Sequence, residues 1–544
     1  MNSKPITSLF VALCAILLAV PLLGGGLASA GTPATIDQAS ARALTGTLAP
    51  LVHDGYHARG SATFSPAKSG ASAQLQVKSI KSGSWSTVAT GKQDSSGKAS
   101  FYVGDPLEVT HEYRAVSDGT TSNVVQYAGP YKDKATGLAT VYFNSNDGES
   151  VNTRDKYFDG EFAMKGATNS KVGACNNDGV LAGQALKAEM KGRGNYSWSF
   201  PKKSFTLKLD KARNLCGMGS SKKWALVAND YDKSLLRNSV AYELGKRFSH
   251  LQWTPDEKPV DLFVNGSYRG SYSLVERPTN TGATLPALGG RVPITAADVG
   301  SSPGSVGYLM EWDFRKGAQY NFGAGSNGWV GLKEPEDEEY SAAMGSYIND
   351  YVDKADAAVR QAATSDNWKN YIDINSAVDY YLAMEFLKPV DGNMWASVYM
   401  YKPQNGGKLK FGPLWDFDLA AGSATRAGNV ASPSSWYLRN SLGVSAMQSS
   451  KTWFNYLNDS AEFRAAARAR WNQLDQGLHM NAFIADRKAL LGKSAAENYV
   501  KWNHGSRISG YQVIKSSWAS DVEYLRSWTE SRNQWIDSQL DDAD

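Results

Sequence analysis

Residues Phe411–Gly422, FGPLWDFDLAAG, carry an apolar run that leads directly into two acids, Asp416 and Asp418. The apolar residues up to Trp415 predict a buried strand that directly follows a glycine-containing hairpin turn. Carboxylates at the end of a buried strand are unfavourable unless a partner compensates their charge. A divalent cation is a common partner for two hard oxygen donors this close together. Backbone N–H groups of the following turn are the other partner that these residues allow.

The length and composition indicate a globular protein of more than one domain. A chain of 544 residues is too long for one hydrophobic core, so two or three domains are expected. Hydrophobic residues make up 42% of the chain and charged residues 20%, which is not the composition of a disordered protein. The net charge of +4 is too balanced to indicate nucleic acid binding.

The first 30 residues have the pattern of a secretory signal peptide. Lys4 supplies a positive charge, residues 10–23 form an apolar run, and residues 28–30, ASA, form a small-x-small cleavage site. The apolar run is too short for a comfortable membrane span. No later stretch is apolar enough to cross a bilayer. We therefore expect a secreted protein, extracellular or at the cell surface, without a membrane span.

Two cysteines remain after the predicted cleavage, Cys175 and Cys216. Outside the cytoplasm, an even pair of cysteines is most simply a disulfide. Two free thiols or a metal site are the less favoured alternatives, because no further Cys or His residues cluster with the pair.

Residues 31–135 predict a small all-β domain. Short runs of alternating polarity recur, for example at residues 73–78 and 98–103, and turns rich in Ser and Gly separate them. This spacing is typical of an immunoglobulin-like β-sandwich. The domain carries no cluster of acids, His or Cys, so we interpret it as an accessory module. An exposed Trp85 would allow contact with a glycan or the cell wall, and this alternative role stays open.

Residues 136–544 predict a second domain that mixes strands with helices, so the expected fold class is α+β. A Gly-rich turn, KGRGN at residues 191–195, joins two strands, and Lys203 starts the second of them. Backbone amides of such a turn and a nearby lysine suit phosphate oxygens. A hairpin with a surface lysine would have the same pattern.

Acidic residues recur at defined places further along. Glu243 lies beside the apolar stripe of a predicted helix, where it either faces inward or is solvated. Glu276 ends the second strand of a hairpin, and Asp391 lies in the loop after a helix at residues 374–387. From about residue 450 onward the pattern is helical. Protein kinases carry the same order of residues: a strand lysine, a helix glutamate, a loop aspartate and a strand-end aspartate.

Four segments together resemble the CotH kinase family, named for a spore coat protein. They are KGRGNYSWSFPKKSFTLKL, ANDYDKSLLRN, VNGSYRGSYSLVER and GPLWDFDLAAG. They occur in the family's order within a stretch from about Ala139 to Glu530. The resemblance implies an atypical protein-kinase-like fold that transfers phosphate from ATP, with Mg²⁺ or Mn²⁺, to hydroxyl side chains. The implied acceptor is an extracellular or surface protein.

The resemblance also implies which residues bind the nucleotide. Lys203 in the PKKS segment corresponds to the lysine that holds the nucleotide phosphates. Glu243, after the LLRN segment, corresponds to the helix glutamate that pairs with this lysine. Glu276, at the end of the SLVER strand, corresponds to the position that meets the adenine.

The remaining roles fall on three aspartates. Asp391 corresponds to the catalytic loop acid, and Asp416 and Asp418 correspond to the two acids of the family's WDxD signature, with Asp416 catalytic through the metal that it binds. The chain departs from the family pattern at one point. An Asn that would be a second metal ligand is absent from its usual place, where Ser397 stands, and Asn393 is a candidate substitute. This departure leaves the activity in question.

Two other functions stay open at this stage. A catalytically weak or inactive CotH-like scaffold, or a cell-surface structural protein, would use the same fold without phosphate transfer. A glycan hydrolase would use Asp416 and Asp418 as its acid pair. Such an enzyme does not need the lysine, helix glutamate and loop aspartate that accompany the pair, so it is the least favoured.

Overall fold

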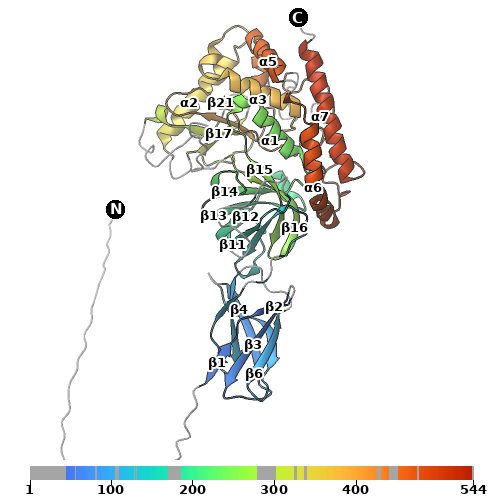
Figure 1. The fold of residues 1–544 in the computed structure, drawn as a ribbon. Helices are drawn as coiled ribbons and strands as arrows, with labels where there is room; N and C mark the ends of the chain where they lie inside the picture. The colour runs from blue at the N-terminus through green and yellow to red at the C-terminus, as the bar shows by residue number, and fades with distance from the viewer. Residues whose placement is uncertain are drawn as a thin grey trace, which may run out of the picture. The chain divides into compact units, whose positions relative to one another are not determined.

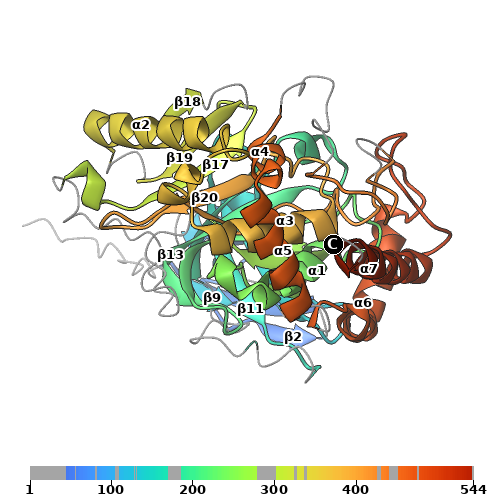
Figure 2. The same ribbon diagram turned by 90° about the horizontal axis from the view of Figure 1, so that it is seen from above.

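The computed structural model describes residues 44–541, apart from residues 55–56, 80–82, 104–109, 128, 130–131, 170–174, 176–185, 279–301, 324–327, 336–339, 426–429, 440–450 and 475–476. The predicted signal peptide, residues 1–30, lies outside the described residues. Helices and β-sheets both occur (Figures 1 and 2), which confirms the α+β class. None of the helices within these described ranges is long and apolar enough to cross a bilayer.

The strands between residues 45 and 127 form two antiparallel sheets. In one sheet the order is β1 (Thr45–Leu48), β3 (His57–Ser65) and β2 (Val52–Asp54), with β6 (Lys98–Val103) also paired to β3. In the other the order is β5 (Ser86–Lys92), β4 (Ser72–Ser79), β7 (His111–Ser117) and β8 (Thr120–Thr121), with β9 (Val125–Tyr127) also paired to β7. The inward side chains of both sheets, such as Phe64, Leu75, Phe101 and Tyr113, share one core. The immunoglobulin-like relationship and the boundary at residue 135 remain predictions.

Trp85, the residue that suggested a glycan contact, is half-buried. The Arg114 guanidinium lies 4.2 Å from the centroid of its ring, and the Lys78 ammonium lies 5.0 Å from it. These cation–π contacts use the ring surface on which a sugar would stack. The structure therefore adds no support to the glycan interpretation.

Seven strands close into a barrel at the start of the second part of the chain. They are β10 (Ala139–Ser145), β11 (Phe158–Lys165), β12 (Leu186–Arg193), β13 (Ser204–Asn214), β14 (Ser220–Val227), β16 (Ser267–Glu276) and β15 (Glu257–Val264), in the order of the closed barrel. The parallel pairing of β10 with β15 closes it. Apolar side chains that alternate along the strands, including Phe162, Leu207 and Leu274, fill the interior.

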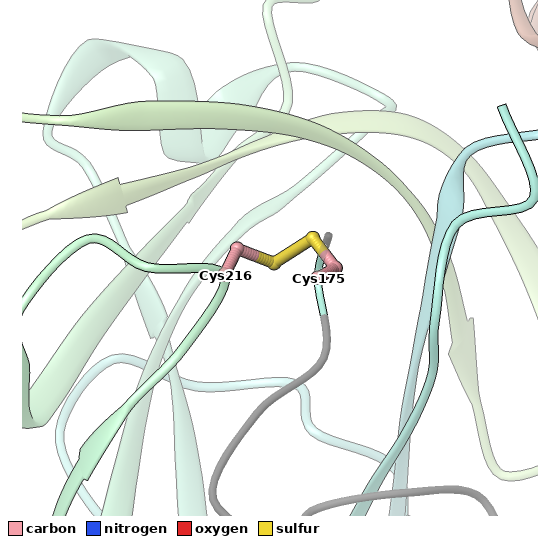
Figure 3. Close-up of a disulfide and its surroundings, with 2 residues drawn as sticks. All are labelled: Cys175 and Cys216. Carbon is pink, nitrogen blue, oxygen red and sulfur yellow. A yellow bond between two sulfur atoms is a disulfide. The ribbon is translucent and has the colours of Figure 1, made fainter. Parts of the chain in front are cut away.

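Cys175 and Cys216 form a disulfide with an S–S distance of 2.08 Å (Figure 3), as predicted. Both cysteines are buried and belong to the core that the barrel strands share. The bond therefore joins Cys175, before β12, to Cys216, between β13 and β14, within the barrel core.

Replacing both cysteines by Ser is expected to lower the free energy of unfolding by about 2–4 kcal/mol, because the crosslink restricts the unfolded chain between residues that are 41 apart in sequence. Thermal unfolding of the double variant would measure the effect. Added reductant should bring the parent protein to the variant's midpoint and leave the variant unchanged. Equal midpoints for parent and variant without reductant would contradict the prediction.

The rest of the chain builds a five-stranded sheet covered by helices. The sheet order is β18 (Asn321–Gly323), β19 (Trp329–Glu334), β17 (Tyr308–Asp313), β20 (Val398–Lys402) and β21 (Lys410–Phe411). The helices are α1 (Arg237–Arg247), α2 (Ala342–Val359), α3 (Ile374–Leu387), α4 (Trp453–Asp459), α5 (Ala461–Leu474), α6 (Asn481–Trp502) and α7 (Trp518–Asp541). One continuous core includes Ile348 of α2, Leu382 of α3 and Val398 of β20. Helices from residue 453 onward agree with the helical pattern predicted for the end of the chain.

Helix α6 connects this helical part to the barrel, and α7 lies beside it (Figure 1). Asn498 Oδ1 accepts a hydrogen bond from Ser271 N at 3.2 Å, and Trp502 Nε1 donates to Arg269 O at 2.7 Å. Ser494 Oγ donates to the buried carboxylate of Asp261 at 2.7 Å. These contacts hold the barrel strands β15 and β16 against the C-terminal helices.

Candidate active site

A cavity of about 580 Å³ brings together three of the six site residues predicted from the sequence, Asp391, Asp416 and Asp418. Its walls come from β12, β13 and the end of β14 in the barrel, from α1, and from the five-stranded sheet with its loops. The polar lining residues include Lys191, Arg193, Lys202, Asp230, Asn238, Arg277, Glu311, Asp313, Lys333, Asp391, Ser397, Asp416 and Asp418. Acids and cations thus face the same enclosed space, which suits a ligand that carries both a phosphate chain and a metal ion.

The three aspartates Asp391, Asp416 and Asp418 all line this cavity. Burial raises the pKa of Asp418 well above its usual value, and repulsion by Asp416 and Asp391 adds to this shift. Burial also raises the pKa of Asp416, while the Arg193 guanidinium and a hydrogen bond from Ser397 oppose that shift. The site therefore concentrates carboxylates that lack full compensation by protein groups.

The backbone around the acids differs from the predicted strand. Strand β21 ends at Phe411, because Gly412 has a φ of 110° and Pro413 has no N–H to continue the ladder. Asp416 itself has a φ of 72° and Ser397 a φ of 57°, in the left-handed region. Ser397 Oγ donates to Asp416 Oδ2 at 3.2 Å. The acids thus lie on an irregular loop, which directs Asp416 toward the loop that carries Ser397.

The ANDYDKSLLRN segment holds this loop in place. Asn238 Oδ1 accepts a hydrogen bond from Phe417 N at 2.8 Å, and Asn238 Nδ2 donates to Asn229 Oδ1 at 2.9 Å. Phe417 lies between the two acids in sequence, so its fixed backbone constrains both neighbours. The segment therefore positions the acids through Asn238, and its Asp230 also lines the cavity.

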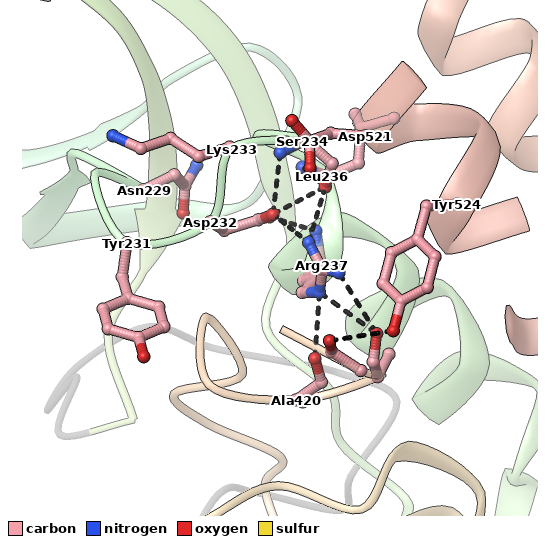
Figure 4. Close-up of polar contacts among 12 residues, drawn as sticks. Asn229, Tyr231, Asp232, Lys233, Ser234, Leu236, Arg237, Ala420, Asp521 and Tyr524 are labelled. Carbon is pink, nitrogen blue, oxygen red and sulfur yellow. Dashed lines mark hydrogen bonds and ion pairs between the residues drawn. The ribbon is translucent and has the colours of Figure 1, made fainter. Parts of the chain in front are cut away.

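Arg237 makes the second connection between the two segments (Figure 4). Its guanidinium forms a buried ion pair with Asp232, and its Nε donates to Ala420 O at 2.9 Å. Asp232 Oδ2 also accepts from Arg237 N at 2.8 Å, at the first residue of α1. Asp232 therefore satisfies the N-terminus of α1 from a preceding turn, since the N-cap position itself is Leu236.

The residues predicted to bind the nucleotide are not brought together. Lys203 Nζ donates to Trp198 O at 2.5 Å, whereas Glu243 pairs with Arg247 one turn further along α1, with an N–O distance of 3.0 Å. The predicted ion pair between Lys203 and Glu243 is therefore wrong. Glu276 is buried at the end of β16, opposite Trp224 of β14. None of the three predicted residues is among the described residues that line the cavity.

The face of a strand explains the error at Lys203. The cavity is lined by Lys202, Ser204 and Thr206. The alternate residues Phe205 and Leu207 point into the barrel core. Side chains alternate between the two faces, so a shift of one residue exchanges them. Lys202 is thus the lysine of this pair at the cavity wall.

Asn393, the suggested substitute for the absent Asn ligand, is fully buried and accepts a hydrogen bond from Thr452 Oγ1 at 2.9 Å. It does not line the cavity as the structure describes it. Ser397 does line it and contacts Asp416. The substitute role of Asn393 is therefore wrong, and Ser397 is the residue next to the metal-binding candidates.

Sequence reasoning missed the cations Lys191, Arg193 and Arg277. It treated the KGRGN turn as a source of backbone amides, although Lys191 and Arg193 are two residues apart on β12 and so share one face. The glycine between them has a packing role, since a Cβ at Gly192 would overlap the indole ring of Trp198. If the alternation of side chains between the two strand faces had been followed through KGRGN, it would have predicted that Lys191 and Arg193 lie on the same face.

Asp416 and Asp418 are suited to supply part of the ligand set of a magnesium or manganese ion. No group of three or more His, Cys, Asp or Glu side chains arranged to hold a metal occurs among the described residues. Magnesium in nucleotide-dependent enzymes commonly takes one or two carboxylates, together with substrate phosphates and water. Asp416 is exposed and Asp418 is half-buried at the cavity, and their mutual repulsion fits that smaller share of the ligands.

Comparison with known proteins agrees with this geometry. A search of curated proteins gives no match. A scan against protein-family models finds the model described as CotH kinase protein, which matches residues 190–536. The match includes the KGRGN turn, α1, Asp391 and the Asp416–Asp418 loop, and it spans more than half of the chain. The chain therefore belongs to the CotH kinase family.

Proposed function

We propose that this protein is a secreted CotH-type kinase that transfers phosphate from Mg-ATP to hydroxyl side chains of an extracellular or surface protein. The observation that supports this most is the convergence of Asp391, Asp416 and Asp418 with several lysine and arginine side chains in one cavity. Family membership supports a kinase in general. We further propose that the barrel and the helical part correspond to the two lobes of an atypical protein-kinase-like fold.

In this proposal each aspartate has its own task. Asp416 and Asp418 would hold Mg²⁺ or Mn²⁺, which would neutralise charge on the phosphate oxygens. Asp391 lies in the loop after α3 and orients the acceptor hydroxyl, whose proton its carboxylate takes. Ser397 Oγ keeps Asp416 in its unusual backbone conformation by donating to Oδ2. Phosphoryl transfer depends mainly on positioning and charge neutralisation, so few residues are needed.

A catalytically inactive scaffold is the alternative, and a specific observation favours it. Ser397 contacts Asp416 where the family pattern places an amide ligand, so the protein offers one metal ligand fewer. A scaffold would bind no nucleotide and show no metal-dependent change in stability.

The test is to incubate the purified mature protein with ATP and Mg²⁺ or Mn²⁺, and to follow phosphate incorporation by intact and peptide mass spectrometry. Candidate secreted acceptors would be added in a parallel series, and thermal shift with ATP would report nucleotide binding. A metal-dependent thermal shift and phosphate on the protein or an acceptor are the expected results. Absence of both the shift and the phosphate would overturn the kinase proposal in favour of the scaffold.

A further inference from the structure

Three cations, Lys191, Arg193 and Arg277, line the cavity and form no ion pair with the described acidic residues. Lys191 and Arg193 lie on the same face of β12, and Arg277 is the first residue after β16. All three line the cavity. In the described part of the chain, none of them forms an ion pair or a side-chain hydrogen bond.

Two of these cations, Lys191 and Arg193, lie against aromatic rings. The Lys191 ammonium lies 4.7 Å from the centroid of the Tyr157 ring, and the Arg193 guanidinium lies 5.1 Å from that of Trp415. Nη1 of Arg193 is buried and has no hydrogen-bond partner among the residues that the structure describes. A buried guanidinium nitrogen without an acceptor is unfavourable unless a ligand supplies one.

The three charges also repel one another. Burial lowers the pKa of both Lys191 and Arg193. The positive charge of Arg277 is the second largest cause and lowers both pKa values further. The negative charge of Asp416 opposes the lowering of the pKa of Arg193, and both residues line the cavity. An anion at the wall would relieve the repulsion and satisfy the open donors.

The two lysines of the PKKS segment are in a different situation. Lys202 Nζ donates to Ala228 O at 2.7 Å and to Ser271 O at 2.5 Å, and Lys203 Nζ donates to Trp198 O at 2.5 Å. Burial lowers the pKa of Lys202 to about 7. Both ammonium groups are thus engaged by backbone carbonyls, and a phosphate would have to displace these contacts.

The shape of the KGRGN turn keeps Arg193 in position. Gly194 has a φ of 99°, and Arg154 Nη1 donates to Gly194 O at 2.5 Å and to Asn195 Oδ1 at 3.2 Å. Gly192 allows the Trp198 ring to pack against the turn. The turn therefore presents the guanidinium from a braced backbone, and less entropy is lost when a ligand binds.

We propose that Lys191, Arg193 and Arg277 form the site for the phosphate chain of the nucleotide, in place of the lysine expected from the PKKS segment. Guanidinium groups match phosphate oxygens with two parallel donors, and Lys191 adds a point charge. This inference rests on the proposed function, because it names the residues that hold the ATP phosphates. Arg193 then links the phosphate chain to Asp416 and its metal.

The test measures binding of ADP, without metal and with Mg²⁺, by calorimetry, and of inorganic tripolyphosphate in a separate titration. Arg193→Gln and Arg277→Gln are each expected to weaken both ligands about 10- to 100-fold, the loss typical of a charge-assisted contact. Arg193→Lys should recover part of the affinity. Lys203→Gln should change the affinity less than about 3-fold, since that ammonium already has a backbone partner. Lys208→Gln, which breaks a surface pair with Glu189 on the same barrel, is the control for the loss of one charge.

The outcomes separate this inference from the proposed function. Unchanged affinity in both arginine variants, with phosphate transfer intact in the parent, would overturn the inference alone. A large loss in Lys203→Gln with none in Arg193→Gln would overturn it in favour of the PKKS lysine. Binding of tripolyphosphate that depends on the arginines, without ADP binding or transfer, would support the anion site and overturn the kinase. Midpoints of thermal unfolding close to that of the parent would show that the variants are folded.

Discussion

Replacing Asp416 by Asn is expected to abolish most phosphoryl transfer while leaving the fold intact. A metal ion contributes several kcal/mol of transition-state stabilisation, and at about 1.36 kcal/mol per tenfold its loss corresponds to a rate about 1,000-fold lower. Asn is the suitable replacement because Asp416 has a φ of 72°, a conformation that Asn tolerates better than Ala does. Its side-chain oxygen can also accept the hydrogen bond from Ser397.

The thermal midpoint of Asp416→Asn should equal that of the parent or exceed it, because the variant removes one of several carboxylates that repel one another. Initial rates of phosphate incorporation and thermal unfolding would be measured on the same preparation. Asp159→Asn, on the exposed face of β11, is the matched control and should retain full activity. A rate within a few-fold of the parent would exclude Asp416 as the metal ligand, and with it the central assignment of the proposed mechanism.

Replacing Arg532 by Met is expected to cause the largest loss of stability, about 3–5 kcal/mol, because it leaves the buried charge of Glu385 without its partner. Both side chains are fully buried, and the distance from Arg532 Nη2 to Glu385 Oε2 is 3.1 Å. The same guanidinium donates to Glu385 O, Pro433 O and Ser435 O. It therefore joins α7, α3 and the segment after the acidic loop at one point.

The effect should extend to the activity proposed here, since this contact supports the loop that carries Asp391. Glu385 Oε2 accepts from Tyr437 N at 2.6 Å, and the Tyr437 hydroxyl donates to Pro389 O at 2.5 Å, two residues before Asp391. Thermal and urea unfolding would measure the loss. Arg526→Met, an exposed arginine on the same helix, should leave the midpoint unchanged, and adding Glu385→Gln to Arg532→Met should recover part of the stability. A midpoint for Arg532→Met close to that of the parent would contradict a structural role for the pair.

The loop that carries Asp416 and Asp418 shows what a local sequence pattern can predict and what it cannot. The DFD stretch indicated a site because buried carboxylates need compensation, and its acids do line the cavity. The pattern could not reveal that the strand ends at Phe411, or that Phe417 N is held by Asn238 from nearly 180 residues earlier. That contact depends on how α1 packs, which no window of sequence around the loop contains.

Lys203 shows what the sequence pattern could not predict about the site. Lys203 has the expected residue type at the expected place in the order of motifs, but its neighbour Lys202 faces the cavity and both donate to backbone carbonyls. Glu243 has the helix position of a lysine partner, but Arg247 is one turn away and pairs with it. Residue identity and order were insufficient because a one-residue change of face reverses the assignment.

The sequence by itself determined the α+β class, the disulfide between Cys175 and Cys216, and the family, because these depend on periodicity, cysteine number and motifs that are local in the chain. Only the tertiary structure decided which charges meet. Closure of the barrel places Lys191, Arg193 and Arg277 on one wall, and the packing of α1 and α3 places the aspartates beside them. Charges interact through space over a few ångströms, so the electrostatics of the site depends on strand faces and helix packing rather than on the order of residues.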